Sequence, residues 1–207
     1  MDATCEVIAT RQRLRELTGQ PSRRAVNKVI DHIDAVCRRF IAASPFMIVA
    51  SRGADGRIDV SPKGDPAGFV AVLDDKTLAI PDRPGNHRHD TFENVLSCPE
   101  VGLCFLIPGH GDTLRVGGTA KIVRDARLQA RLAVAGREPT LILLVTVERA
   151  FMHSSKCVTR SRLWNPEAWP DRANVPTLAE AIMAHAKPVE TISEVQTFID
   201  QHNARLY

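Results

Sequence analysis

Long hydrophobic runs are missing from this 207-residue sequence. The longest apolar stretches lie near residues 46–50 and 141–147, well short of the roughly 20 residues that a helix needs to cross a bilayer. The sequence also lacks a run of Lys or Arg, and its net charge is only +3, which disfavours nucleic acid as the main partner. We therefore expect no membrane-spanning segment and no nucleic-acid partner.

Cysteine is scarce and irregularly spaced. The five cysteines are odd in number and form no C-x-x-C pair, so neither a disulfide framework nor a cysteine-rich zinc site is expected. Residues 1–6 lack the charged-then-apolar pattern of a secretory signal. Together these features predict a reducing, cytoplasmic location.

Common nucleotide and hydrolase motifs are missing too. There is no G-x-G-x-x-G, no G-x-x-x-x-G-K-[ST] and no G-x-S-x-G, which argues against a Rossmann site, a P-loop and a serine hydrolase. His87-x-His89 would suit a metal, but no third ligand is evident nearby and Arg88 between them opposes a cation. We therefore expect no metal site.

What the sequence does contain is a series of short apolar segments joined by turn signals. Asp55-Gly56, Asp74-Asp-Lys76 and Pro108-Gly-His-Gly-Asp112 each separate two apolar runs, a pattern typical of β-hairpins. A helix over about 90–97 interrupts the series. The expected strands cover 46–51, 57–61, 68–73, 77–81, 101–107, 113–123 and 141–151. This order predicts a mainly β fold, a closed or partly split antiparallel barrel of six or seven strands with flanking helices.

Helical patterns flank the expected barrel. Residues 6–17 and 22–42 are predicted to be helices, with Ser22 as an N-cap and Ser44-Pro45 ending the second. The apolar face of the second comprises Val26, Val29, Ile30, Ile33, Val36, Cys37 and Phe40. Short helices are expected over 126–133, 178–186 and 192–205, the last with Val195, Phe198 and Ile199 pointing inward. We assign one domain, 1–207, with N-terminal helices over 1–43, the barrel over 44–165 and C-terminal helices over 177–206.

The loop over 83–91 combines polar and basic side chains with the start of a helix. These side chains are Arg83, Asn86, His87 and Arg88. Asp90 and Glu93 have the spacing of a capping box, and the free N–H groups of a helix start attract anions. Lys63 on the neighbouring strand would add a cation. Two interpretations stay open from the residues alone: a phosphate-binding corner, and an ordinary basic surface loop.

Five motifs occur in one order along the chain. They are Ser61-Pro-Lys-Gly-Asp-Pro, Ile80-Pro-Asp-Arg-Pro-Gly-Asn, Asn94-x-x-x-x-Pro99-x-Val-Gly-Leu, Leu114-Arg-Val-x-Gly and His153-x-x-Lys156-x-x-x-Arg160-Ser161-x-Leu-Trp164. In this order they resemble the flavin-nucleotide-binding proteins of the pyridoxamine 5'-phosphate oxidase superfamily. The resemblance covers residues 28–170.

The resemblance implies a split β-barrel of the FMN-binding type that forms a homodimer, with an FMN in each interface cleft. It implies that Lys63 and the loop hold the flavin phosphate, and that the segment over 153–164 reaches the flavin from the other protomer. The cofactor-binding residues carried over are Ser61, Lys63, Pro81, Asp82, Arg83, Asn86, Arg88, Thr91, Thr113, Lys156, Arg160, Ser161 and Trp164. Which of His87, Arg88 and Thr91 meets the phosphate is left open.

The resemblance also implies a flavin-dependent oxidoreductase acting on a small molecule, with a reduced nicotinamide as a candidate donor. No catalytic residue is assigned, because the flavin ring carries the electrons. The alternative is a non-enzymatic protein that stores or senses flavin or haem. The oxidases that give the family its name end in a Trp…Arg-Leu-Ala-Pro-like segment that helps bind the vitamin phosphate. Here the corresponding residues are Ala204-Arg-Leu-Tyr207, so oxidation of pyridoxamine 5'-phosphate is not expected.

Overall fold

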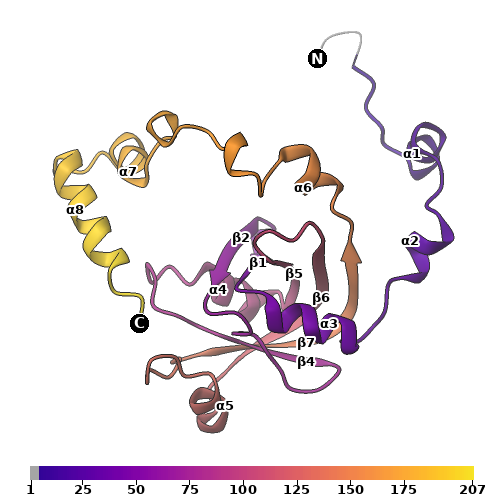
Figure 1. The fold of residues 1–207 in the computed structure, drawn as a ribbon, viewed down its shortest axis with the longest axis horizontal. Helices are drawn as coiled ribbons and strands as arrows, with labels where there is room; N and C mark the ends of the chain where they lie inside the picture. Colours follow the sequence, from indigo (N-terminus) through magenta and orange to yellow (C-terminus); the bar gives the residue numbers. More distant parts are fainter. Residues whose placement is uncertain (1–4) are drawn as a thin grey trace.

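The protein is described by a computed structural model covering residues 5–207. Residues 1–4, on which the expected N-terminal boundary and part of the signal-sequence argument rest, lie outside the described residues. The central element is a seven-stranded antiparallel sheet in the order β2-β1-β5-β6-β7-β4-β3 (Figure 1). Its strands are β1 Phe46–Arg52, β2 Ile58–Gly64, β3 Ala71–Val72, β4 Thr77–Pro81, β5 Glu100–Leu106, β6 Thr113–Val123 and β7 Ile142–His153. The expected mainly β split barrel is confirmed, and it is not closed, because β2 and β3 are the two edges of the sheet.

The three expected hairpins are present, and local turn chemistry explains them. β1 pairs with β2 across Asp55-Gly56, where Gly56 has a φ of 81° that glycine adopts without strain. β3 pairs with β4, and β5 with β6. The pairing of β6 with β7 shifts register between Gly117 and Gly118, and paired glycines in a strand favour such a bulge.

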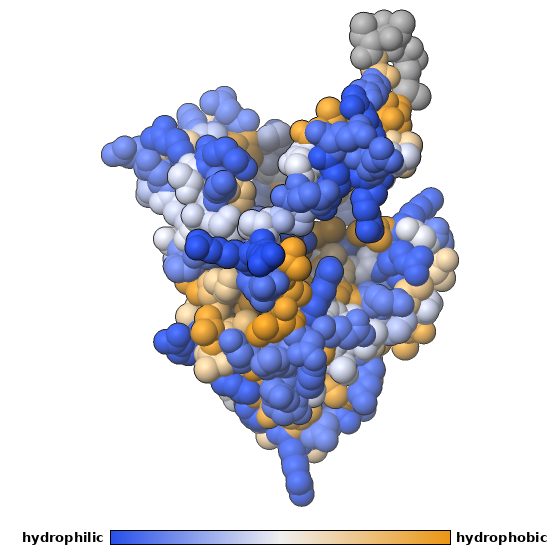
Figure 2. All heavy atoms as spheres, turned by 90° about the vertical axis from the view of Figure 1, so that its right-hand side faces the viewer, coloured by the Kyte–Doolittle hydropathy of each residue, from blue (hydrophilic) through white to orange (hydrophobic). Residues whose placement is uncertain are grey.

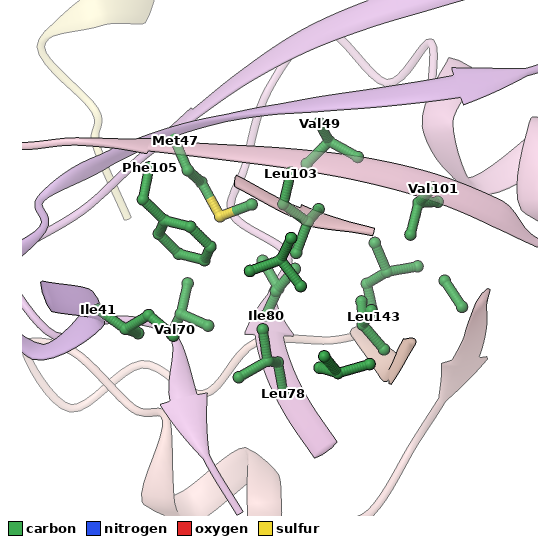
Figure 3. Close-up of a cluster of buried hydrophobic side chains, with 14 of the residues drawn as sticks. Ile41, Met47, Val49, Val70, Leu78, Ile80, Val101, Leu103, Phe105 and Leu143 are labelled. Carbon is green, nitrogen blue, oxygen red and sulfur yellow. The ribbon is translucent and has the colours of Figure 1, made fainter. Parts of the chain in front are cut away.

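The hydrophobic core fills the concave side of the curved sheet. Buried positions alternate along β1, so that Met47 and Val49 face inward, as the period of two in a strand requires. Figure 3 shows these side chains meeting Phe105 and Leu103 of β5 and Ile80 of β4. The alternation therefore turns the opposite face of β1 and its neighbours outward.

The segment over 22–42, expected to be one helix, is two helices separated by a bridge to the sheet. The helices are α2, Arg23–Asn27, and α3, Ala35–Ala43. Ile30 exchanges backbone hydrogen bonds of 3.0 and 2.7 Å with Ala150 of β7, which the helical periodicity could not foresee. Asp34 then caps α3 by accepting from the Cys37 N–H. Val26, Val29 and Val36 of the predicted apolar face are consequently exposed.

The other helices follow their expected positions more closely. Ahead of α2, helix α1, Arg11–Thr18, begins later than expected because Thr10 is its N-cap. The remaining elements are α4 Asp90–Ser97, α5 Ala126–Arg131, α6 Lys156–Ser161, 3-10 turns η1 Pro166–Ala168 and η2 Arg172–Asn174, α7 Leu178–Ala186 and α8 Ile192–Asn203. Thr177 and Thr191 form full capping boxes with Glu180 and Glu194. In α8, Val195 is buried, whereas Phe198, expected to point inward, is 68% exposed.

Two helical arms extend from the barrel (Figure 1). We call residues 5–29, with α1 and α2, the N-terminal arm, and residues 165–207, with α7 and α8, the C-terminal arm. Neither α1 nor α2 contains a buried residue. Within the described part of the chain, each helix is too short or too polar to span a bilayer.

Candidate functional site

Three cavities surround the loop that joins β4 to α4. The helix cavity, of about 220 Å³, lies between β2 and the start of α4. The strand cavity, of about 370 Å³, lies between β2 and the end of β4. Their linings share Ser61, Pro62, Lys63, Arg83, Gly85 and Asn86, so the two adjoin, and together they are called the groove. The tail cavity, of about 400 Å³, lies on the other side of the loop against Tyr207.

The predicted cofactor residues divide into two groups in space. Those that line the helix or strand cavity are Ser61, Lys63, Pro81, Asp82, Arg83, Asn86, Arg88 and Thr91. The others, Thr113, Lys156, Arg160, Ser161 and Trp164, line none of the three cavities. Thr113 opens β6 opposite His153, and the Trp164 indole donates to the His110 carbonyl at 2.8 Å. Within one chain, the loop and the segment over 153–164 are therefore not brought together.

The start of α4 presents unpaired backbone donors to the helix cavity. The expected capping box is wrong: the N-cap is His89, at a φ of 53° and with no side-chain hydrogen bond, and Asp90 is the first helical residue. The Glu93 N–H donates to the His89 carbonyl at 2.9 Å, so the N–H groups of Asp90, Thr91 and Phe92 have no acceptor within the helix. These three residues line the helix cavity, where such donors favour an anion.

Two buried side-chain oxygens in the helix cavity have no partner. Among the described residues that are not exposed, Asp59 Oδ2 and Thr91 Oγ1 are the buried side-chain polar atoms without a hydrogen bond, and both residues line this cavity. Thr91 is only 4% exposed. Burying a polar atom without a partner costs about 1–3 kcal/mol, so each oxygen favours a partner from outside the chain, a water molecule or a ligand.

The charges around the loop are largely compensated. Arg88 Nε donates to Asp90 Oδ2 at 2.8 Å, which keeps the pKa of Asp90 below its ordinary value and that of Arg88 above it. Lys63 is paired through its backbone with β1, and its ammonium has no ion pair or hydrogen bond to another described residue. Lys63 is therefore a cation of the groove whose ammonium is free to bind a ligand.

Arg83 lines all three cavities, but most of its guanidinium is already hydrogen-bonded to other residues of the chain. Its Nε donates to Asp65 Oδ2 at 2.5 Å and its Nη2 to the Leu132 carbonyl at 2.8 Å. The Asp65 side chain is 1% exposed and also accepts from the Tyr207 hydroxyl, while the Tyr207 ring lies 5.7 Å from the guanidinium. Arg83 is thus part of a buried ion pair, with Nη1 as its remaining donor group.

Asp82 lies between the helix and tail cavities and lines both. Burial raises the pKa of its carboxyl, and the charges of Lys63, His89 and Arg83 oppose that rise. His87 and His89 follow it in the loop, with ring centroids 6.1 Å apart. Over residues 5–207, no group of three or more potential ligands is arranged to hold a metal ion.

No role was predicted from the sequence for Asp59, Asp65 or Tyr207. Asp59 could have been predicted from the sequence, because alternation along β2 places Asp59, Ser61 and Lys63 on the same side of the strand. Asp65 and Tyr207 meet across 142 positions in sequence, and no local pattern signals such a contact.

The fold and groove define a class of protein: an antiparallel split barrel with a basic loop between its second hairpin and an inserted helix. A family model described as pyridoxamine 5'-phosphate oxidase matches residues 33–154, more than half of the chain. The chain belongs to this family. None of the curated proteins matches it.

Solved structures of similar fold are remote in sequence. HupZ of Group A Streptococcus is 21% identical with a TM-score of 0.50, over 59% of this chain and 95% of that one. A Clostridium acetobutylicum protein related to general stress protein 26, of the pyridoxinephosphate oxidase family, is 16% identical with a TM-score of 0.41, over 56% and 84%. HutZ, the haem storage protein from Vibrio cholerae, is 12% identical with a TM-score of 0.41, over 59% and 94%. At these identities the likeness concerns the fold alone.

Proposed function

We propose that this protein binds FMN in the groove beside β2 and α4 and is a flavin-dependent oxidoreductase acting on a small molecule. The observation that carries the proposal is the pair of unpartnered oxygens, Asp59 Oδ2 and Thr91 Oγ1, in one cavity. They lie beside the free N–H groups of α4 and Lys63, whose ammonium forms no ion pair.

One of the two oxygens can donate to an acceptor and the other needs a donor, and FMN carries both kinds of group. A threonine hydroxyl can donate to a phosphate oxygen, as can the Lys63 ammonium and the N–H groups at the start of α4. An ionised Asp59 only accepts, so it needs a donor, which the ribityl hydroxyls of a flavin supply. The carboxylates of a haem are acceptors like Asp59, so the groove suits FMN better than haem.

The oxidoreductase part of the proposal rests on what FMN does when bound: it carries electrons between two substrates. The residues of the chain bind and orient it, and no acid–base pair is required of them. A reduced nicotinamide is the electron donor that we would assay first. The five cysteines are free thiols, which agrees with the reducing cytoplasm that we propose as the location.

A homodimer forms part of the same proposal. The predicted residues of the segment over 153–164 line none of the cavities around the loop of their own chain, so a second copy would have to supply them. Light scattering on the FMN-loaded protein should give the mass of a dimer. A monomer with full flavin occupancy would contradict this.

The binding site is tested by comparing FMN with riboflavin, which keeps the ribityl hydroxyls and lacks the phosphate. Lys63→Ala should weaken FMN binding by about 1.5–3 kcal/mol, the range for hydrogen bonds to charged groups, and leave riboflavin binding nearly unchanged. Asp59→Ala should weaken both ligands alike, because both carry the hydroxyls. Lys121→Ala, an exposed lysine of β6, is the matched control. Binding is measured by flavin fluorescence titration.

Two results would remove the assignment. Equal affinity of the unaltered protein for FMN and riboflavin would show that no phosphate is recognised. An absorption spectrum of the purified protein with a haem Soret band and no flavin would favour the storage alternative. Steady-state oxidation of a reduced nicotinamide by the FMN-loaded protein then separates an enzyme from a flavin carrier.

A further inference from the structure

The N-terminal arm carries exposed apolar side chains within a basic segment. Of the seven Lys, Arg, Asp and Glu residues between Arg11 and Lys28, six are basic. Leu14 and Leu17 of α1 lie three residues apart, on one side of the helix, and are 44% and 55% exposed; Val26 of α2 is 55% exposed. An isolated helix of eight residues is marginal in water, so α1 needs a packing partner.

The C-terminal arm has the opposite charge. Of the nine Lys, Arg, Asp and Glu residues over 165–207, six are acidic, and of the five between Thr177 and Asn203, which include α7 and α8, four are acidic. α7 and α8 pack against each other through Ala179 and Val195. Their outer surfaces leave Leu178, Ile192 and Phe198 exposed, at 62%, 48% and 68%. The second arm thus combines apolar side chains with an acidic surround.

These two complementary surfaces do not meet within one chain. In Figure 1 the N-terminal arm leaves the barrel on the side opposite to α7 and α8. Figure 2, turned by 90°, shows orange apolar atoms among the blue polar atoms on the N-terminal arm. The chain therefore carries two matching surfaces that it holds apart.

We propose that the N-terminal arm of one copy packs against the C-terminal arm of a second copy. The partner is a second copy because the acidic, apolar surface that matches the basic arm is present in the chain itself and cannot be reached internally. Two-fold symmetry forms the contact twice, burying α1 in each copy. The inference rests on the proposed homodimer and adds the surface that secures it.

Charge reversal tests the arms by their effect on dimer dissociation. We would compare Arg23→Glu/Arg24→Glu with Glu190→Lys/Asp200→Lys, none of which lines a cavity or forms a cap. At low salt each variant should raise the dissociation constant at least about tenfold, since four weak ion pairs per dimer are each replaced by a repulsion. Combining all four changes in one chain should restore the dissociation constant to within about threefold. Arg124→Glu/Arg127→Glu, on the exposed part of α5 and its approach, is the control of equal charge.

Cross-linking tests whether the arms meet between chains. Leu17→Cys and Phe198→Cys are placed together in one chain, and protein of natural isotope content is mixed with ¹⁵N-labelled protein before treatment with a bis-maleimide. Mass spectrometry should find the peptides that contain the two introduced cysteines joined to each other, one light and one heavy. The pair Leu17→Cys with Leu96→Cys, an exposed position of α4, should give no such product.

The outcomes separate this inference from the homodimer itself. A stable dimer whose dissociation constant is unaffected by either reversal, with cross-links only within one chain, overturns the arm contact and leaves the dimer in place. An unaltered FMN-loaded protein that is monomeric overturns both. Binding of RNA by the N-terminal arm, abolished by Arg23→Glu/Arg24→Glu without any change in dimerisation, also overturns the inference.

Discussion

Arg83 shows how one side chain can belong to both the core and the candidate site. Its ion pair with Asp65 leaves that carboxylate 1% exposed, and removing one partner of such a pair costs about 3–5 kcal/mol because the other charge stays buried. Replacing Arg83 would therefore reduce stability as well as any phosphate contact. Lys63, which lines the same groove without an ion pair, is the residue whose replacement reports on ligand binding.

Tyr207→Phe should destabilise the protein modestly and in a pH-dependent way. Phenylalanine keeps the ring beside Arg83 but loses the hydroxyl that donates to Asp65, at a cost of about 1 kcal/mol at neutral pH. This hydrogen bond raises the pKa of Tyr207 above its ordinary value of 10.0. A raised pKa in the folded state means that the contribution is complete below the unfolded pKa and is lost as pH rises through the folded one.

Urea unfolding at several pH values checks this. The difference in unfolding free energy between the unaltered protein and Tyr207→Phe should stay constant from about pH 7 to 9 and narrow above about pH 10. A difference that widens with pH would mean that the phenol is not held as a donor to Asp65.

Residue-level predictions from sequence succeeded where a local pattern existed. Ser22 was expected as an N-cap and is one, because a cap depends on the three residues that follow it. The placing of His89 as the cap of α4 was missed, since its left-handed backbone depends on how the loop over 83–89 closes rather than on residue type. Part of the groove could be predicted from the sequence, namely the side of β2 that faces it and the basic loop. The contact of Tyr207 with Asp65 could not.

At the scale of elements, the β6–β7 pairing depends on one glycine. A Cβ on Gly118 would lie 1.9 Å from the Thr146 carbonyl oxygen, a backbone atom that cannot move away without breaking the ladder. Gly118→Ala should therefore destabilise the protein by about 3 kcal/mol or more, the upper range for overpacking. The measurement is urea unfolding followed by circular dichroism.

Gly117→Ala is the matched control for this change. A Cβ there would lie 2.9 Å from the Nε of Arg149, the end of a flexible side chain that can rotate aside, so the expected cost is well below that of Gly118→Ala. Equal destabilisation by the two changes would show that glycine flexibility, rather than the close approach of Thr146, matters at the bulge.

Element boundaries were predictable from sequence only where no distant strand intervened. The hairpins around Asp55-Gly56 and Asp74-Asp-Lys76 are set by the turns themselves. The expected helix over 22–42 fails at Ile30, whose backbone bonds to Ala150 in β7 compete successfully with the helix. The helical periodicity of apolar residues depends only on the segment itself. It carries no information about pairing with a strand 120 residues away in the sequence.

At the scale of the whole molecule, the arms were foreseen as helices but not as projections. α1 and α2 have an apolar side, which in a globular chain predicts packing on the core. Neither helix contains a buried residue, so packing on the core of their own chain does not account for these apolar side chains. The proposed contact between two copies would account for them.

The last prediction concerns a reaction that the protein should not carry out. The FMN-loaded protein should show little or no oxidation of pyridoxamine 5'-phosphate. A phosphorylated substrate needs a cationic site separate from the one that would hold the flavin phosphate. Around the groove Arg83 is paired with Asp65, Arg88 with Asp90, and Lys63 would serve FMN. In the segment 204–207, Tyr207 contributes an aromatic contact to Arg83, and Arg205 lines none of the three cavities around the loop. FMN-loaded protein is supplied with pyridoxamine 5'-phosphate and oxygen, with a known oxidase as positive control, and pyridoxal 5'-phosphate is followed by absorbance. Turnover of about 1 per second or faster, the ordinary enzymic scale, would contradict this and point to the tail cavity, beside Arg137, as the second phosphate site.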